Sequence, residues 1–216
     1  MGTSVSWKFK LLMLGWFSLA YLFFYIYPNF HPSFQPYYLP LWKVDHVVPF
    51  LPWTFIVYLS DYVLIACVIA LINDMPRFRS FARVCFLTLI MCGTFFLFFP
   101  TRYPRPHYPE IDNALISALM ALVKHLDTPN NCFPSMHVAI TGTATWCLRF
   151  KGPKLFSIYA LWAIAIFVST MTTKQHYFVD ILGGVAIVAS VALIEWFFFT
   201  KDFLKLQQRL SKYSLT

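Results

Sequence analysis

Hydrophobic residues in this chain gather in six long runs separated by short polar stretches. The runs cover residues 9–28, 52–73, 82–100, 135–150, 154–173 and 177–199. A helix needs about 20 apolar residues to cross the hydrocarbon core of a bilayer. The pattern therefore predicts an all-α, polytopic membrane protein built as a bundle of six transmembrane helices.

Two segments between the runs have a different pattern. Residues 28–50 are rich in aromatic residues and carry a proline at nearly every fourth position, which prevents a long helix and suits a membrane-surface segment. Residues 111–126 are amphipathic but too short and polar to span. We expect them to form an extra surface or re-entrant helix before the fourth span.

The first run follows Lys8 and Lys10 and resembles a signal peptide over Leu11 to Tyr27. Bulky residues continue to its end, and no small-residue cleavage site precedes Tyr27 and Pro28. We therefore expect this run to be a retained helix.

Composition supports a membrane protein. The chain of 216 residues is 59% hydrophobic and only 12% charged, which is more apolar surface than a soluble domain of this size can bury. It has no internal repeat, so we expect a single membrane domain over residues 1–216.

The distribution of the positive charges predicts a topology. The net charge is +8, but the cations are spread over short loops and form no nucleic-acid-binding surface. With the amino terminus inside, the cytoplasmic side carries twelve cations and the outer side five. The positive-inside bias therefore predicts that both termini are cytoplasmic. We expect the protein in the cell membrane or inner membrane, with an active site at the outer face, in the periplasm or a lumen. The five outer cations are Lys43, Arg102, Arg105, Lys124 and Lys174.

The cysteines give no sign of a metal site. Four of the five lie inside hydrophobic runs, and Cys132 stands alone in a polar stretch. Their spacing matches no zinc or disulfide pattern, so we expect ordinary buried thiols. We also expect no cofactor, because the candidate chemistry described next needs no metal.

The outer ends of the runs carry the candidate chemistry. The predicted topology places Arg102, Arg105 and Lys174 on the same side as two histidines and a carboxylate, namely His137, His176 and Asp180. Cations kept on the outer side against the general bias indicate an anionic ligand, and phosphate fits them best.

These side chains could carry out phosphoryl transfer. His176 and Asp180 are four residues apart, so on a helix the carboxylate can hold one imidazole nitrogen and leave the other free to attack phosphorus. His137 would protonate the leaving oxygen. The three cations and Ser135 would bind the phosphate oxygens, and the helix start near Ser135 also favours an anion.

With these residues in place, the chain resembles the type 2 phosphatidic acid phosphatase superfamily. Its motifs are Lys, six residues, Arg-Pro; then Pro-Ser-Gly-His; then Ser-Arg, five residues, His, three residues, Asp. In this chain they correspond to Arg105-Pro106, Pro134 to His137, and Ser169 with His176 and Asp180. Over about residues 80–200, the resemblance implies a six-helix catalytic core, a phosphohistidine at His176, a general acid at His137 and no metal.

Three positions depart from these motifs. Phe98 stands at the motif lysine, Met136 at the motif glycine and Thr170 at the motif arginine. We expect Arg102 and Lys174 to replace the missing cations. The changes resemble a Phe-Pro-Ser-x-His branch that also contains phosphotransferases similar to inositol phosphorylceramide synthase.

Three functions therefore stay open. The first is a phosphatase for a lipid phosphate or diphosphate, such as polyprenyl diphosphate, phosphatidate or phosphatidylglycerol phosphate. The second is a lipid phosphotransferase with the same site. The third is a transporter or assembly subunit with Asp61 and Glu195 as a proton relay. For these two intramembrane acids we favour helix–helix hydrogen bonds, distant from the site if both lie in the cytoplasmic half.

Overall fold

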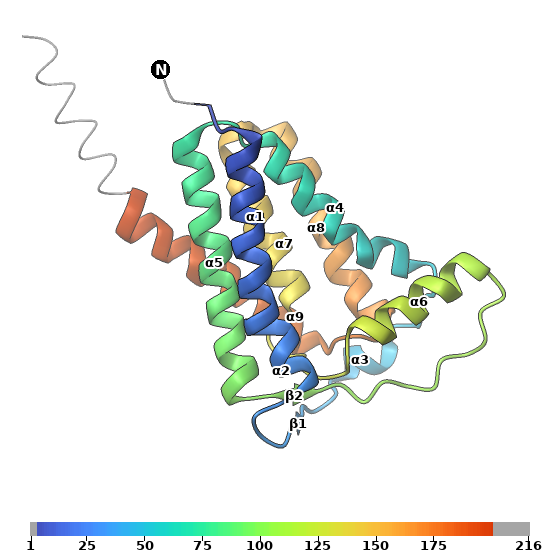
Figure 1. Cartoon of the computed structure of the whole chain (residues 1–216). Helices are drawn as coiled ribbons and strands as arrows, with labels where there is room; N and C mark the ends of the chain where they lie inside the picture. The colour runs from blue at the N-terminus through green and yellow to red at the C-terminus, as the bar shows by residue number, and fades with distance from the viewer. Residues whose placement is uncertain (1–3, 201–216) are drawn as a thin grey trace, which may run out of the picture.

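The structure is a computed structural model that describes residues 4–200, and it is a helical bundle. Within the described residues, five helices are long and apolar enough to cross a membrane. The first is continuous from α1 (Trp7–Tyr21) through a π-helical turn, η1 (Leu22–Ile26), to α2 (Tyr27–Phe30). The others are α4 (Thr54–Leu71), α5 (Met75–Phe98), α8 (Pro153–Thr172) and α9 (Phe178–Glu195), which continues into η3 (Trp196–Thr200). Figure 1 shows them arranged side by side, with α4 and α8 tilted away from α1 and α5.

The all-α class is confirmed, but the count of six spans is not. The fourth run forms α7 (Met136–Trp146), of 11 residues, followed by the five-residue 3₁₀ turn η2 (Cys147–Lys151). This helix lies in the centre of the bundle, against α4, α5, α8 and α9. Most of its side chains are buried by protein, so α7 packs against neighbouring helices rather than lipid.

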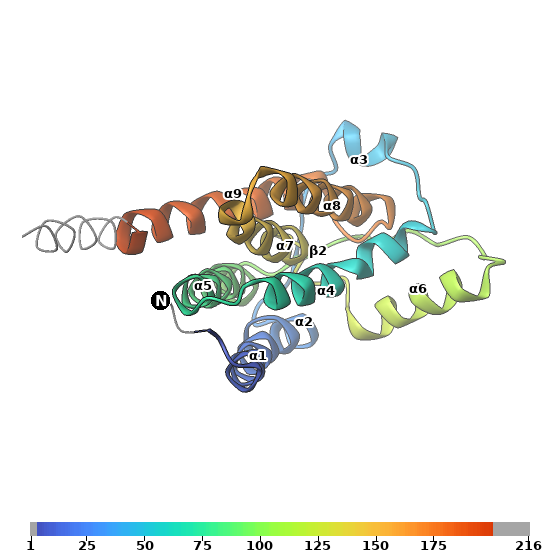
Figure 2. The same ribbon diagram turned by 90° about the horizontal axis from the view of Figure 1, so that it is seen from above.

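The expected extra helix before the fourth run is present as α6 (Ala114–Leu126). It lies outside the bundle (Figure 2) and packs Val123 against Phe55 and Tyr58 of α4. Its other side chains are mostly exposed or half-buried, which agrees with the amphipathic pattern of this stretch.

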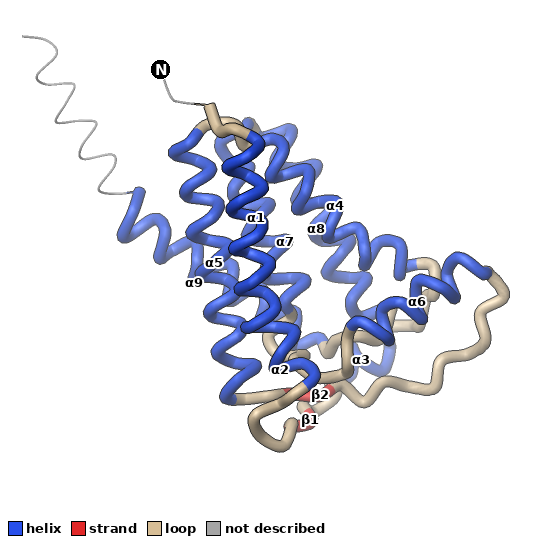
Figure 3. Tube along the Cα trace, in the orientation of Figure 1, coloured by secondary structure: helices blue, strands red, loops and turns tan. Residues whose placement is uncertain are grey.

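Residues 31–53 cross the end of the bundle opposite to the amino terminus. They form the short strand β1 (Tyr37–Tyr38), which pairs in parallel with β2 (Thr101–Arg102), and the one-turn helix α3 (Lys43–Val47). Figure 3 shows the two strands together below the helices. The prolines keep this segment from forming a long helix, as the sequence predicts.

The amino-terminal end of the bundle is held together by polar contacts of its own. Lys10 is buried, and its Nζ donates to Ile69 O at 2.7 Å and to Asn73 Oδ1 at 2.9 Å. Glu195 of α9 pairs with Arg83 of α5 at 2.6 Å. The expected helix–helix hydrogen bond of Glu195 is therefore confirmed, at the end of the bundle far from α3 and the two strands.

Candidate active site

The turn between α8 and α9 places His176. Helix α8 ends in a Schellman arrangement, because the Lys174 N–H donates to Met171 O and the Gln175 N–H to Thr170 O, both at 3.0 Å. The residue at the left-handed position of such a turn is usually glycine, but here it is Lys174, with φ of 54°. The chain then reverses within three residues and brings His176 to the start of α9.

His176 has a defined tautomer in this arrangement. Its Nδ1 lies 3.2 Å from Asp180 Oδ2 and 3.1 Å from the Cys132 carbonyl oxygen. Both groups accept hydrogen bonds, so Nδ1 carries the proton. The same Asp180 oxygen also accepts the Tyr177 N–H at 2.9 Å, which fixes the carboxylate. The Nε2 of His176 has no hydrogen-bond partner in the described part of the chain, so in the neutral form of the ring it presents a free lone pair.

The start of α7 packs closely on the start of α9. Ser135 is the N-cap of α7, and its backbone N–H donates to the Asp180 carbonyl at 3.0 Å. Gly184 permits this approach, because a Cβ there would lie 2.7 Å from Val138 and 2.9 Å from the Ser135 carbonyl oxygen. The contact brings the ring of His137 to 6.0 Å from that of His176, measured between ring centres. Two imidazoles at this separation can flank one phosphorus atom.

His137 is held by two residues of α4. Its Nδ1 lies 2.7 Å from Asp61 Oδ2, and its Nε2 lies 2.6 Å from the Tyr58 hydroxyl. All three side chains are buried or nearly so. The carboxylate orients the ring and stabilises its protonated form, and the hydroxyl gives the other nitrogen a partner for proton transfer.

Asp61 corrects one expectation. It does make a helix–helix hydrogen bond, but with His137, so it belongs to the site instead of lying far from it. An acid inside an apolar run is a functional candidate from sequence alone, yet its partner is 76 positions away. No sequence feature distinguishes Tyr58 from the many other aromatic residues of the chain, so its role could not be predicted. Asp61 pairs with His137 and Glu195 pairs with Arg83, which gives a shared proton relay no support.

The two arginines anchor themselves to the loop that precedes α7. Arg102 donates from Nε to Asn130 Oδ1 at 2.8 Å, and no other side-chain hydrogen bond of Arg102 occurs among residues 4–200. Arg105 donates from Nη1 to the Asp127 carbonyl at 2.9 Å and lies 3.7 Å from the Asp127 carboxylate. Part of each guanidinium therefore positions the loop, and part is available to a ligand.

Arg105 has an unused donor. Its Nε is buried without a hydrogen-bond partner, and leaving such a group unpaired costs about 1–3 kcal/mol. The guanidinium also lies within electrostatic range of Tyr58 and Cys132, which flank the two histidines. The loop itself is fixed by α2, because Asn29 donates to Asp127 at 3.0 Å. A bound anion would satisfy the unpaired Nε.

The ammonium of Lys174 is hydrogen-bonded to the segment that contains α3. Its Nζ donates to the carbonyl oxygens of Asp45 and Val48, at 3.1 and 2.5 Å. Burial lowers the pKa of Lys174, and the Asp45 carboxylate opposes that shift. The same carboxylate accepts the Phe178 N–H at 2.7 Å. In this conformation Lys174 and Asp45 together fasten α3 to the α8–α9 turn.

The three residues that depart from the family motifs lie in different surroundings. Phe98 is exposed at the end of α5, and Met136 is buried in the core. Thr170 is also buried, and its carbonyl accepts the backbone N–H groups of Gln175 and His176. No cation stands at any of the three positions, so the positive charge nearest the histidines in sequence is Lys174.

Cys132, His176 and Asp180 form a group whose ligand atoms lie within 4.8 Å of one another. Three such atoms are enough for a candidate metal site. However, burial raises the pKa of the Cys132 thiol, and its Sγ donates to the Pro129 carbonyl at 3.1 Å. A protonated thiol is a poor metal ligand, because the thiolate is the form that binds metals.

Comparison with known proteins agrees with this geometry. A sequence model described as the PAP2 superfamily matches residues 36–194. A search of curated proteins and a search of solved structures find no significant match. The matched region begins before α3 and so includes Tyr58 and Asp61 as well as the three motifs. The chain belongs to the PAP2 superfamily, whose members are generally phosphatases or phosphotransferases.

Proposed function

We propose that this protein is an integral-membrane lipid phosphatase that works through a phosphohistidine at His176. One observation carries the proposal: Asp180 and the Cys132 carbonyl hold Nδ1 of His176, and its free Nε2 belongs to a ring 6.0 Å from the ring of His137. An imidazole that is fixed at Nδ1 and has a free lone pair on Nε2 is a suitable nucleophile.

In the first step, Nε2 of His176 attacks phosphorus and the bond from phosphorus to the lipid oxygen breaks. His137, protonated and oriented by Asp61, supplies the proton for that oxygen through the Tyr58 hydroxyl. In the second step, water attacks the phosphohistidine and gives a proton back to His137. Phosphate leaves, and both histidines return to their starting forms.

The surrounding charges would stabilise the transferring phosphoryl group. Arg102 and Arg105 would bind its non-bridging oxygens, assisted by the Ser135 hydroxyl and the amino end of α7. Lys174 would add positive charge from the turn while it stays anchored to α3. Neither step needs a metal.

The substrate class we propose is a lipid phosphate or diphosphate in the bilayer, such as polyprenyl diphosphate, phosphatidate or phosphatidylglycerol phosphate. By the charge bias, the termini are cytoplasmic and the site faces the periplasm or a lumen. An alcohol that replaces water in the second step would make the protein a phosphotransferase of the inositol phosphorylceramide synthase type, with the same residues.

The test is turnover of a phosphate-labelled lipid by purified protein in detergent. We expect free phosphate from the wild type, undiminished by chelators, and loss of turnover by about a thousandfold or more in His176→Ala. His125→Ala, at an exposed histidine of α6, is the matched control. Retained turnover in His176→Ala would refute the phosphohistidine, and inhibition by chelators would favour a metal at Cys132, His176 and Asp180. Adding an inositol-containing lipid or ceramide shows whether the label moves to a new lipid.

A further inference from the structure

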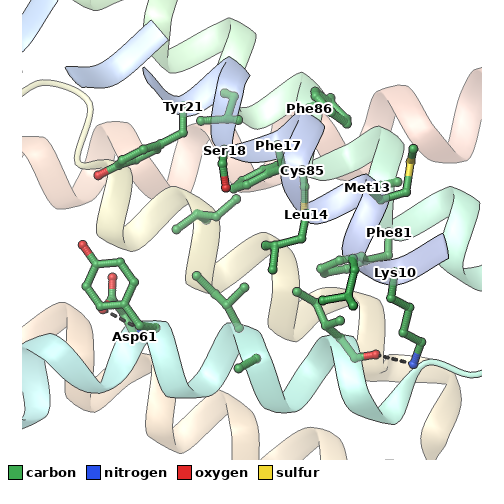
Figure 4. A pocket seen from close by; sticks show the side chains of 18 of the residues that line it. Lys10, Met13, Leu14, Phe17, Ser18, Tyr21, Asp61, Phe81, Cys85 and Phe86 are labelled. Atoms are coloured by element: carbon green, nitrogen blue, oxygen red, sulfur yellow. Dashed lines mark hydrogen bonds between the residues drawn. The ribbon is translucent and has the colours of Figure 1, made fainter. Parts of the chain in front are cut away.

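A cavity of about 450 Å³ lies between α1, α4, α5 and α7. Apart from a few polar groups near its ends, its lining is apolar, and Figure 4 shows side chains of α1 and α4 facing each other across it. Its volume is in the range of small-molecule sites, about 300–1,000 Å³.

The cavity exists because α1 packs loosely. Lys10 is the one buried residue of α1, and apolar residues that line the cavity, such as Leu11 and Leu14, are exposed. Lys10 also lines the cavity at its amino-terminal end, where its ammonium is bonded to α4 carbonyl oxygen and to Asn73. That end of the cavity therefore presents a fixed polar group. Between Lys10 and Asp61, the side chains that line the cavity are predominantly apolar.

The other end reaches the candidate active site. Asp61 and His137 both line the cavity, and they are hydrogen-bonded to each other. His137 is the group that we assign to protonating the leaving oxygen. In a lipid phosphate, that oxygen is the one that carries the hydrocarbon, so the chain has to extend away from phosphorus on the His137 side. His137 is among the residues that line the cavity, whereas His176 is not.

We infer that this cavity binds the hydrocarbon chain of the leaving lipid alcohol, an inference that rests on the proposed function. From Lys10 to Tyr21, α1 rises about 17 Å at about 1.5 Å per residue. One leaflet of hydrocarbon is about 15 Å deep, half of a core about 30 Å thick. The cavity therefore matches a chain of leaflet length and ends at the Lys10 ammonium.

The first experiment fills the cavity. Ala66 of α4 lines it, whereas the exposed Ala70 on the same helix does not, so Ala66→Phe and Ala70→Phe form a matched pair. We expect Ala66→Phe to raise KM for a long-chain alkyl phosphate by about tenfold, and to leave a short, water-soluble alkyl phosphate unaffected. Equal effects on both substrates, no effect on either, or the same effect in Ala70→Phe would overturn the inference.

The second experiment does not depend on turnover. The His176→Ala protein is labelled with a long-chain alkyl phosphate carrying a photoreactive group at the chain end, and the labelled peptides are identified by mass spectrometry. We expect labels on α1 and α4 near Lys10 and Ile69. A neutral alcohol of the same length should label these positions several-fold less, because it lacks the group that Arg102 and Arg105 bind.

The outcomes of the two experiments separate the two proposals. Equal labelling by the phosphate and the alcohol would mean that bulk lipid fills the cavity, and crosslinks between two copies would mean a second chain; either result overturns the inference. Phosphate-dependent labelling without turnover in the wild type would instead leave the cavity assigned and refute the proposed phosphatase.

Discussion

Two His–Asp pairs stand side by side in this protein and differ in origin. His176 lies in the turn two residues before α9 and Asp180 lies in the first turn of that helix, with Nδ1 and Oδ2 3.2 Å apart. His137 and Asp61 come from α7 and α4, with the corresponding atoms 2.7 Å apart. In both pairs the carboxylate contacts Nδ1, and Nε2 is the nitrogen to which we assign the chemistry.

The roles that we propose for the two histidines differ because Nε2 has a different partner in each. Nε2 of His176 has no hydrogen-bond partner among residues 4–200, as a nucleophile requires. Nε2 of His137 lies 2.6 Å from the Tyr58 hydroxyl, as proton transfer requires. The comparison teaches that a His–Asp pair does not define a function by itself, because the partner of the free nitrogen decides what the histidine can do.

The largest effect among the following changes is expected for Asp180→Asn. Asparagine can present its N–H₂ to Nδ1 and favour the other tautomer, which removes the lone pair from Nε2. We expect turnover to fall by about a hundredfold or more, for aryl phosphates with a good leaving group as well as for alkyl phosphates. Equal activity of the variant and wild type on the aryl phosphate would contradict the nucleophilic role of His176.

Asp61→Asn should have a smaller and more selective effect. Without the carboxylate, protonated His137 loses its stabilising charge, so only reactions that need an acid suffer. We expect alkyl phosphate hydrolysis to fall by about ten- to a hundredfold, and aryl phosphate hydrolysis to change little. If both substrates lose activity equally, the two pairs do not have separate roles and the comparison fails.

Tyr58→Phe tests the relay itself. The ring and its packing remain, and only the hydroxyl that we propose as the relay between His137 and the leaving oxygen is removed. We expect a loss of about tenfold for alkyl phosphates and none for aryl phosphates, measured as kcat on the purified variant. Unchanged kcat for alkyl phosphates would mean that His137 protonates the leaving oxygen directly.

Gly184→Ala probes the packing that brings the two pairs together. The added Cβ would lie 2.9 Å from the Ser135 carbonyl oxygen, a backbone atom that cannot rotate away. We expect a loss of about 1–3 kcal/mol in stability, measured as a lower thermal midpoint in detergent, together with reduced activity. Gly15→Ala is the control, because nothing lies within 4 Å of the added atom and alanine favours a helix. A midpoint in Gly184→Ala equal to that of wild type would show that the contact is not tight.

The sequence was sufficient for features that depend on nearby residues. Hydrophobic runs predicted the helices, proline spacing predicted the irregular segment after the first span, and the amphipathic stretch predicted α6. The spacing of His176 and Asp180 predicted that pair, although His176 meets Asp180 from the turn before α9 and not from a shared helix face. The interior position of α7 was not predictable, because a helix buried by protein and one buried by lipid have the same apolar pattern.

The same chain length and composition would have allowed many placements of Asp61, Tyr58 and Lys174. Asp61 meets His137 only because α4 packs against α7, and the Lys174 ammonium turns to α3 only because Asp45 and the Schellman turn bring those segments together. The sequence by itself determined which elements form and which residue types face one end of the bundle. Tertiary packing alone decided which of those residues touch, because contacts between distant segments depend on how the helices fit together.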